Sequence, residues 1–99
     1  MNVLICKSLF QSLVSLSGTD VKRANDFILK FQDNPAQPSL SLERITNTKN
    51  DTLWSARITQ DLRAVIYKDG DTWALLHAGH HDAAYHWASN RNVELNNKS

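Results

Sequence analysis

The sequence predicts an α+β fold, in which a small antiparallel sheet packs on an N-terminal helical hairpin and is followed by a short C-terminal helix. Three observations predict this fold. Apolar residues recur with a period near 3.6 on both sides of Gly18, which is typical of two consecutive helices. Three later segments alternate apolar and polar residues, which is typical of half-buried strands. Two of these segments flank Asp69-Gly70, a pair favoured in tight hairpin turns.

The first third of the chain predicts a strand and the two helices. Val3–Cys6 is a short, partly β-branched apolar run that favours a buried strand. Asn34-Pro35 is expected to end the second helix, because proline pushes the preceding residue out of the helical region. The expected helix caps are Ser8 for the first helix and Thr19 or Asp20 for the second. The expected apolar stripes are Leu9, Phe10, Leu13, Val14 and Leu16 in the first helix and Val21, Ala24, Phe27, Ile28 and Phe31 in the second.

The rest of the chain predicts an antiparallel meander. We expect an irregular segment anchored by Leu40, Leu42 and Ile45, then strands over Leu53–Ile58, Arg63–Lys68 and Thr72–Ala78. A type I′ turn at Asp69-Gly70, with positive φ at both residues, would pair Lys68 with Asp71, Ile66 with Trp73 and Ala64 with Leu75. Gly79 is expected to end the last strand and Asp82–Ser89 to form the final helix. All helices are expected on one face of the sheet.

Composition excludes several classes of protein. The 99 residues suit one domain, and a content of 41% hydrophobic and 21% charged residues excludes collagen-like, low-complexity and wholly disordered chains. The single cysteine, Cys6, excludes an internal disulfide and a Cys-based zinc finger and suits a reducing compartment. No apolar run approaches the roughly 18 residues of a membrane span, and no cation precedes the apolar N-terminal run as in an export signal. We therefore expect a cytoplasmic protein without membrane association.

Positive charge gathers in one segment, although the net charge of +1 is low for a nucleic-acid-binding protein. Between Arg44 and Lys68, five cations stand against two anions. The candidate nucleic-acid contacts are Arg44, Lys49 and Lys68, with Trp87 as a candidate stacking aromatic.

The histidines mark the candidate site, because all four lie within ten residues where the last strand meets the last helix. Imidazoles titrate near neutrality and can move protons, while arginines hold phosphate groups. RNA carries its own nucleophile, the 2′-hydroxyl, so such a site needs no catalytic serine, cysteine, metal or other cofactor. The candidate catalytic residues are Arg57, Arg63, His81, Tyr85 and His86.

Two other interpretations of these residues remain open. His77, His80, His81 and Asp82, with His86, are competent ligands for zinc or another divalent ion. Arg57 and Arg63 could instead form ordinary surface ion pairs with Asp51 or Asp61.

At this point the sequence resembles the RelE/ParE superfamily of bacterial toxins. The resemblance rests on the arginine-bearing strand Leu53–Ile58, on the Asp, Arg and Tyr residues of Asp61–Tyr67, and on Leu75–Tyr85, which ends in G-H-x-x-x-x-Y. It covers nearly the whole chain by element order and about residues 42–87 by motif. The residues from His80 to Ala88 are most similar to a RelE-like segment at the front of some UvrD-type helicase proteins.

The resemblance implies a toxin-like endoribonuclease of a type II toxin–antitoxin pair. Its partners would be RNA, including ribosome-bound mRNA, and a cognate antitoxin that wraps the cleft. Arg57 and Arg63 match phosphate-handling arginines, His81 stands where many members have Arg, and Tyr85 matches the aromatic near the scissile nucleotide. The low net charge and the absence of a lysine-rich segment, of which only Lys49 is present, count against cleavage on the ribosome.

The alternative is a non-catalytic RelE/ParE-like module that binds nucleic acid or protein. It would be either a gyrase-poisoning relative or a helicase-associated domain at the N-terminus of a longer chain.

Overall fold

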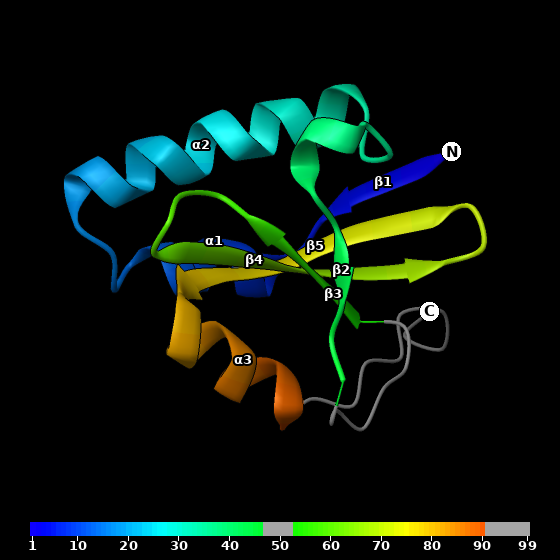
Figure 1. Ribbon diagram of the computed structural model, residues 1–99. Helices are drawn as coiled ribbons and strands as arrows, with labels where there is room; N and C mark the ends of the chain where they lie inside the picture. Colours follow the sequence, from blue (N-terminus) through cyan, green and yellow to red (C-terminus); the bar gives the residue numbers. More distant parts are fainter. Residues whose placement is uncertain (47–52, 91–99) are drawn as a thin grey trace.

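The computed structural model describes residues 1–46 and 53–90. Its elements are β1 (Asn2–Ile5), α1 (Lys7–Leu13), α2 (Gly18–Asp33), a short 3-10 helix η1 (Pro38–Leu40), β2 (Glu43–Arg44), β3 (Leu53–Arg57), β4 (Leu62–Asp69), β5 (Thr72–His80) and α3 (His81–Ser89). The strands form one sheet in the order β1-β5-β4-β3-β2 (Figure 1). The predicted meander β3-β4-β5 is confirmed as antiparallel, whereas β1 pairs with β5 in parallel at the edge of the sheet.

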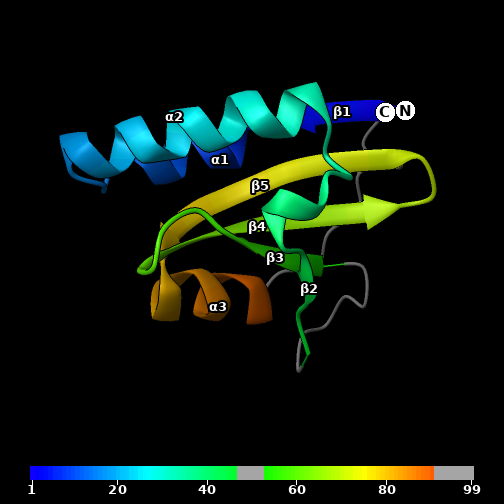
Figure 2. The same cartoon turned by 45° about the horizontal axis from the view of Figure 1, so that its top comes forward.

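Helices cover both faces of this sheet. Figure 2 shows α1 and α2 on one side and α3 on the other. The expectation that all helices share one face was therefore wrong. The physical reason is that β4 and β5 are apolar on both faces: Ile66 and Leu75 belong to the core beneath α1 and α2, while Val65 and Leu76 belong to the core beneath α3. Each apolar face needs its own cover.

The helix α2 follows the sequence prediction closely. Ala24, Phe27 and Phe31 are buried, and Asn34 ends the helix in an extended conformation before Pro35. The predicted caps, Thr19 and Asp20, were wrong by a few residues. The cap is Ser17, whose side chain accepts a hydrogen bond from the backbone N–H of Asp20, and Gly18 lies in the first helical turn.

The helix α1 differs from its prediction in its cap and its stripe. Leu9 is fully buried, but Phe10 and Val14 are exposed. Ser8 does not cap the helix: its hydroxyl donates to the carbonyl oxygen of Leu76 in β5. Ser12 Oγ in turn accepts from the backbone N–H of Ala78, at 3.1 Å. Two serines thus attach α1 to the main chain of β5.

The β4–β5 hairpin differs from the predicted register. Asp69 pairs with Thr72, so the two turn residues are Gly70 and Asp71 rather than Asp69-Gly70. Of these two turn residues, only Gly70 has a positive φ, of 58°, which matches the sign pattern of a type II′ turn and not the predicted type I′. Lys68 consequently pairs with Trp73.

A β-bulge adds a second shift in the same hairpin. The register changes between Val65 and Ile66, which pair with His77 and Leu75 and leave Leu76 as the extra residue. Ala64 therefore pairs with Ala78 rather than Leu75. The strand β5 also continues through Gly79 to His80, beyond its predicted end.

The segment before β3 anchors the chain as predicted. Leu40 and Ile45 are buried, and Leu42 packs partly against the core beneath α2. Within the described residues, no helix is both long enough and apolar enough to cross a membrane.

Candidate active site

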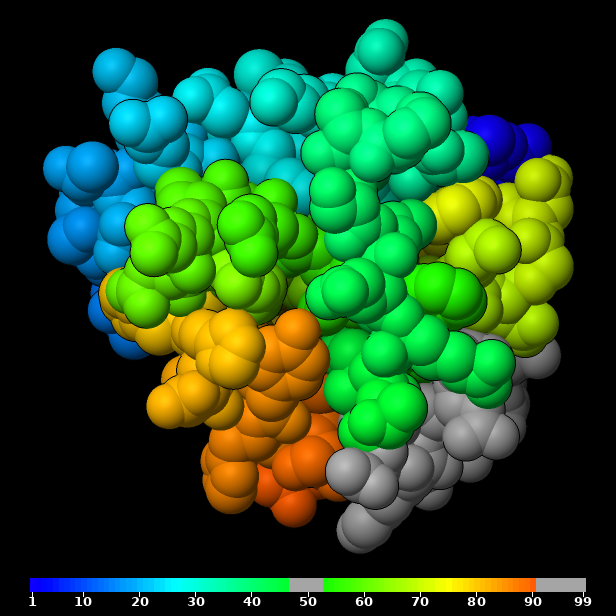
Figure 3. Space-filling model, viewed as in Figure 1, coloured from blue at the N-terminus to red at the C-terminus, as the bar shows by residue number. Residues whose placement is uncertain are grey.

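A groove of about 490 Å³ lies on the α3 side of the sheet. In Figure 3, the start of α3, the β3–β4 turn region and the segment around β2 come together on one face of the molecule. The residues that line the groove are Ser41, Leu42, Glu43, Ser55, Arg57, Arg63, His81 and Tyr85. Four of the five candidate catalytic residues therefore share one groove.

Two arginines face each other across neighbouring strands in this groove. Arg57 of β3 pairs directly with Arg63 of β4 in the sheet register. Like charges in directly opposed positions repel, so an anion between or beside them would relieve an unfavourable interaction. Neither arginine forms an ion pair with any carboxylate among residues 1–46 and 53–90, and Asp61 contacts His80 instead. The proposed surface pairing with Asp61 is thus wrong, and Asp51 lies outside the described residues.

The guanidinium of Arg63 is anchored through one nitrogen. Its Nη1 donates to the carbonyl oxygens of Thr59, Gln60 and Leu62 at 2.8, 3.1 and 3.0 Å. These carbonyls belong to the β3–β4 turn and the start of β4. The anchoring bonds orient the planar group, whose fork geometry suits phosphate oxygens.

The aromatic side of the groove is built by α3 and β3. The hydroxyls of Tyr85 and Ser55 are hydrogen-bonded at 3.0 Å, which ties α3 to the sheet. The His81 ring meets the Tyr85 ring edge-on with centroids 4.7 Å apart. His81 Nδ1 lies 2.9 Å from Oδ1 of Asp82, a contact that orients the imidazole.

The arrangement supplies the groups that proton transfer at a phosphodiester requires. Glu43 is a carboxylate that can accept a proton, and the ring of His81 can donate or accept one. In the sheet register Glu43 pairs with Ser55, and both line the groove on the same face as the arginines.

Comparison with solved structures gives the fold a precedent. The YoeB/ParE toxin from Agrobacterium tumefaciens is 20% identical with a TM-score of 0.59, over 82% of this chain and 99% of that chain. The RelBE2 toxin–antitoxin complex from Mycobacterium tuberculosis is 16% identical with a TM-score of 0.62, over 81% of this chain and 96% of that chain. The RelB–RelE complex from Methanococcus jannaschii is 21% identical with a TM-score of 0.60, over 85% of this chain and 96% of that chain.

The chain has the RelE/ParE toxin fold. Because these identities lie between 16% and 21%, the likeness shows the fold alone. No family model and no curated protein matches the sequence. The fold class expected from the sequence resemblance is therefore confirmed.

His86, the remaining candidate catalytic residue, does not line the groove of this RelE/ParE-like fold. It lies on the exposed side of α3, where its Nε2 is 3.3 Å from Nδ2 of Asn90. The next residue of the helix, the candidate stacking residue Trp87, is itself stacked on His77, with ring centroids 4.5 Å apart. Neither residue is placed to act together with His81 in the groove.

The candidate nucleic-acid contacts lie elsewhere as well. Arg44 pairs with Trp54, which packs on the opposite face of the sheet with α1 and α2. The Nζ atom of Lys68 lies over the rings of Trp54 and Trp73, 5.6 and 5.1 Å from their centroids. Lys49 lies outside the described residues. The groove thus receives its positive charge from Arg57 and Arg63.

The alternative metal set is not brought together. His77 stacks on Trp87, His80 contacts Asp61, and His81 contacts Asp82. Within residues 1–46 and 53–90, no three His, Cys, Asp or Glu side chains are arranged to hold a metal ion.

Sequence reasoning did not assign four of the groove residues to the site: Ser41, Leu42, Glu43 and Ser55. Ser55 could have been found, because it lies two residues before Arg57 in a predicted strand and therefore shares its face. Glu43 gave no local signal, since β2 is only two residues long and takes its place by pairing with β3.

Proposed function

We propose that this chain is a toxin-type endoribonuclease that cleaves RNA in the groove without a metal ion. The observation that carries the proposal is the directly opposed pair Arg57 and Arg63 in the same groove as an imidazole, a phenol and a carboxylate. The paired guanidinium groups favour a phosphate, and the other groups offer the proton transfers that a ribose 2′-hydroxyl needs to attack it.

The proposed reaction is an internal transfer. Glu43 removes the proton of the 2′-hydroxyl, and the resulting oxygen forms a bond to phosphorus. The bond from phosphorus to the 5′-oxygen breaks, and His81 protonates that oxygen as it leaves. The products are a 2′,3′-cyclic phosphate and a 5′-hydroxyl. The arginines stabilise the additional negative charge of the pentacoordinate transition state.

Tyr85 has a positioning part in this scheme. Its ring can stack against a base beside the scissile phosphate, since aromatic side chains bind unstacked bases of single-stranded RNA. The bond to Ser55 and the edge contact with His81 hold the ring in place.

Cleavage of defined RNA tests the proposal. Purified protein is incubated with single-stranded RNA and with translating ribosomes, each with and without a chelator. The variants Arg63→Ala and His81→Ala should both fold. His81→Ala should lose about 10²–10⁴ in rate, as is usual for a positioned acid or base, and Arg63→Ala about 10²–10³, as is usual when a group that stabilises transition-state charge is removed. Arg23→Ala, which removes an exposed cation from α2, is the matched control and should cleave normally.

The outcomes separate the candidate functions. A cyclic phosphate at the new 3′ end and resistance to the chelator are the expected results. Loss of cleavage of free single-stranded RNA with the chelator would refute the metal-free reaction. Binding of RNA without cleavage by the folded wild-type protein would refute the enzyme and favour the non-catalytic module.

We also propose an antitoxin partner that covers the groove. Acidic side chains of such a partner would neutralise Arg57 and Arg63 and exclude RNA. Toxin–antitoxin complexes are among the similar solved structures, including those from Mycobacterium tuberculosis and Methanococcus jannaschii, which supports this proposal. Rescue of growth by co-expression of a neighbouring small reading frame, lost when its acidic residues are changed to amides, is the expected result.

A further inference from the structure

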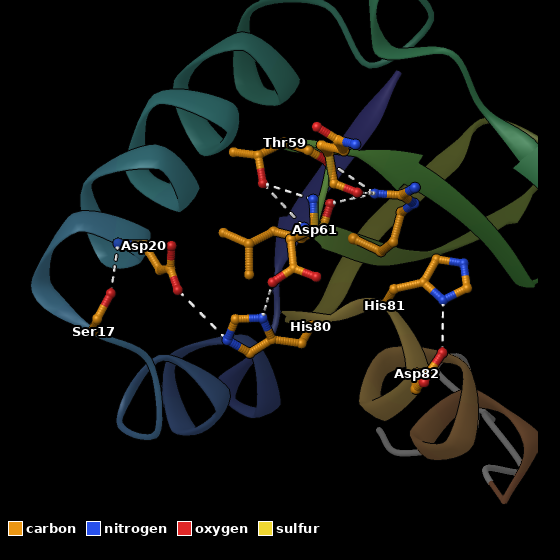
Figure 4. A network of polar contacts seen from close by, with 10 residues as sticks. Ser17, Asp20, Thr59, Asp61, His80, His81 and Asp82 are labelled. Carbon is orange, nitrogen blue, oxygen red and sulfur yellow. Dashed lines mark hydrogen bonds and ion pairs between the residues drawn. The ribbon is translucent and has the colours of Figure 1, made fainter.

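His80 lies between two carboxylates outside the groove. Its Nδ1 is 2.6 Å from Oδ2 of Asp61, and its Nε2 is 3.5 Å from Oδ2 of Asp20 (Figure 4). The three residues come from different parts of the chain: the end of β5, the β3–β4 turn and the first turn of α2. The shorter contact is a strong hydrogen bond, whereas the longer one is a weak ion-pair contact.

Asp61 is held in its turn by further bonds. Its backbone N–H donates to Oγ1 of Thr59 at 3.2 Å, and the same oxygen accepts from the N–H of Leu62 at 3.0 Å. Its carbonyl oxygen accepts from the backbone N–H of His81 at 2.8 Å. The turn is therefore joined to the point where β5 passes into α3.

The same turn supplies the acceptors for Arg63. All three bonds from Arg63 Nη1 go to the carbonyl oxygens of Thr59, Gln60 and Leu62. The guanidinium is therefore oriented by the main chain on both sides of Asp61, and a displacement of the turn would move it.

We infer that His80 and Asp61 are positioning residues that fix the β3–β4 turn and, through it, the Arg63 guanidinium in the groove. The inference rests on the proposed function to the extent that Arg63 binds the scissile phosphate. A displacement of about 1 Å in a phosphate-binding group can cost on the order of 10²-fold in rate.

The pair is exposed enough to be altered without unfolding the protein. The side chains of His80 and Asp61 are 52% and 73% exposed, and exposed ion pairs contribute little to global stability. A loss of function on substitution would then reflect position and not folding, which thermal unfolding of each variant verifies.

Two amide substitutions of His80 separate its contacts. The side-chain nitrogen of His80→Asn sits near the place of Nδ1 and can still donate to Asp61. That of His80→Gln reaches nearer the place of Nε2, toward Asp20, and leaves Asp61 without its partner. We expect His80→Asn to retain cleavage and His80→Gln to lose about 10- to 100-fold in kcat/KM. The control Asp20→Asn should cleave normally, since it alters only the 3.5 Å contact.

A double-mutant cycle tests the route through Arg63. If His80 acts by positioning that guanidinium, adding His80→Gln to Arg63→Ala should cost nothing further in kcat/KM. Additive losses would overturn the inference, as would equal losses in His80→Asn and His80→Gln.

Nuclear magnetic resonance gives a readout independent of cleavage. The Nε–Hε signal of Arg63 is followed during titration with inorganic phosphate. We expect a sharp, phosphate-responsive signal in the wild type and in His80→Asn, and a shifted or broadened one in His80→Gln. This pattern in a protein that cleaves no RNA would support the positioning role while the ribonuclease proposal failed. An Arg63 signal unchanged in His80→Gln would overturn the positioning role itself.

Discussion

The hydroxyl contact between Tyr85 and Ser55 allows a sharp test of how the groove is built. Tyr85→Phe keeps the ring and its edge contact with His81 but removes the partner of Ser55 Oγ, 3.0 Å away. Ser55 lies in β3 and is only 3% exposed, so water cannot readily replace the lost bond. The substitution therefore leaves a buried hydroxyl without its observed partner.

The expected cost follows from that burial. An unsatisfied buried polar group costs about 1–3 kcal/mol of unfolding free energy. In a protein of this size, each kcal/mol lowers the melting temperature by roughly 4–8 °C. Ser55→Ala should cost less, about 0.5–1.5 kcal/mol, because the half-buried hydroxyl of Tyr85 borders the groove and can bind water.

Urea denaturation of the wild type, both single variants and the double variant measures these costs. Adding Ser55→Ala to Tyr85→Phe should be nearly neutral, since the buried hydroxyl left without a partner is then gone. The two substitutions should thus couple by about 0.5–1.5 kcal/mol, which is the cost of Ser55→Ala in the wild-type background. Costs that add to within about 0.3 kcal/mol would refute the reasoning, because the two hydroxyls would then act independently.

Three further predictions concern the core, the hairpin and the thiol. Phe31→Ala should lower the unfolding free energy by about 3–5 kcal/mol, because the ring is fully buried. Leu29→Ala on the exposed face of α2 is the control and should change it by less than about 0.5 kcal/mol. Equal effects of the two substitutions in urea denaturation would contradict the observed packing. Gly70→Val should lower the unfolding free energy by about 1–3 kcal/mol, because the backbone φ is 58° at this position. Gly18→Ala in the first turn of α2 is the control and should leave the unfolding free energy unchanged or raise it. An unchanged unfolding free energy in Gly70→Val would show that the turn conformation differs. Burial raises the pKa of the Cys6 thiol. The rate of Cys6 alkylation should therefore rise at a higher pH than the rate for an unfolded control peptide, because the thiolate is the reacting form. Coincident pH profiles for the protein and the peptide would contradict the burial of Cys6.

The physical signals that sequence carries well are local ones. The apolar stripe through Ala24, Phe27 and Phe31 and the stop at Asn34 depend on residues a few positions apart, and both are confirmed. Arg57 and Arg63 lie on one face because they pair directly across β3 and β4, and Ser55 shares that face because side chains two residues apart in a strand point to the same side. Four of the five residues proposed as catalytic from the sequence share the groove, and His86 does not.

The hairpin register depended on contacts far apart in the chain. The bulge at Leu76 shifts β5, and a bulge leaves main-chain groups that must find partners outside the ladder. Ser8 and Ser12 of α1 contact the main chain of β5 there, at the carbonyl of Leu76 and the N–H of Ala78. A sequence pattern within one hairpin does not contain these bonds, so it could not predict the bulge, which adds to the register shift at the turn.

The sequence by itself determined the two N-terminal helices, the three strands of the meander, the final helix and the resemblance to RelE/ParE toxins. Only the tertiary structure decided that α3 covers the second face, that Glu43 joins the groove and His86 does not, and that Asp61 meets His80. The physical reason is the separation along the chain of the residues that create each feature. Helix and strand periodicity arises from neighbours along the chain, whereas a site is made where strand pairing and core packing bring distant side chains within hydrogen-bonding distance.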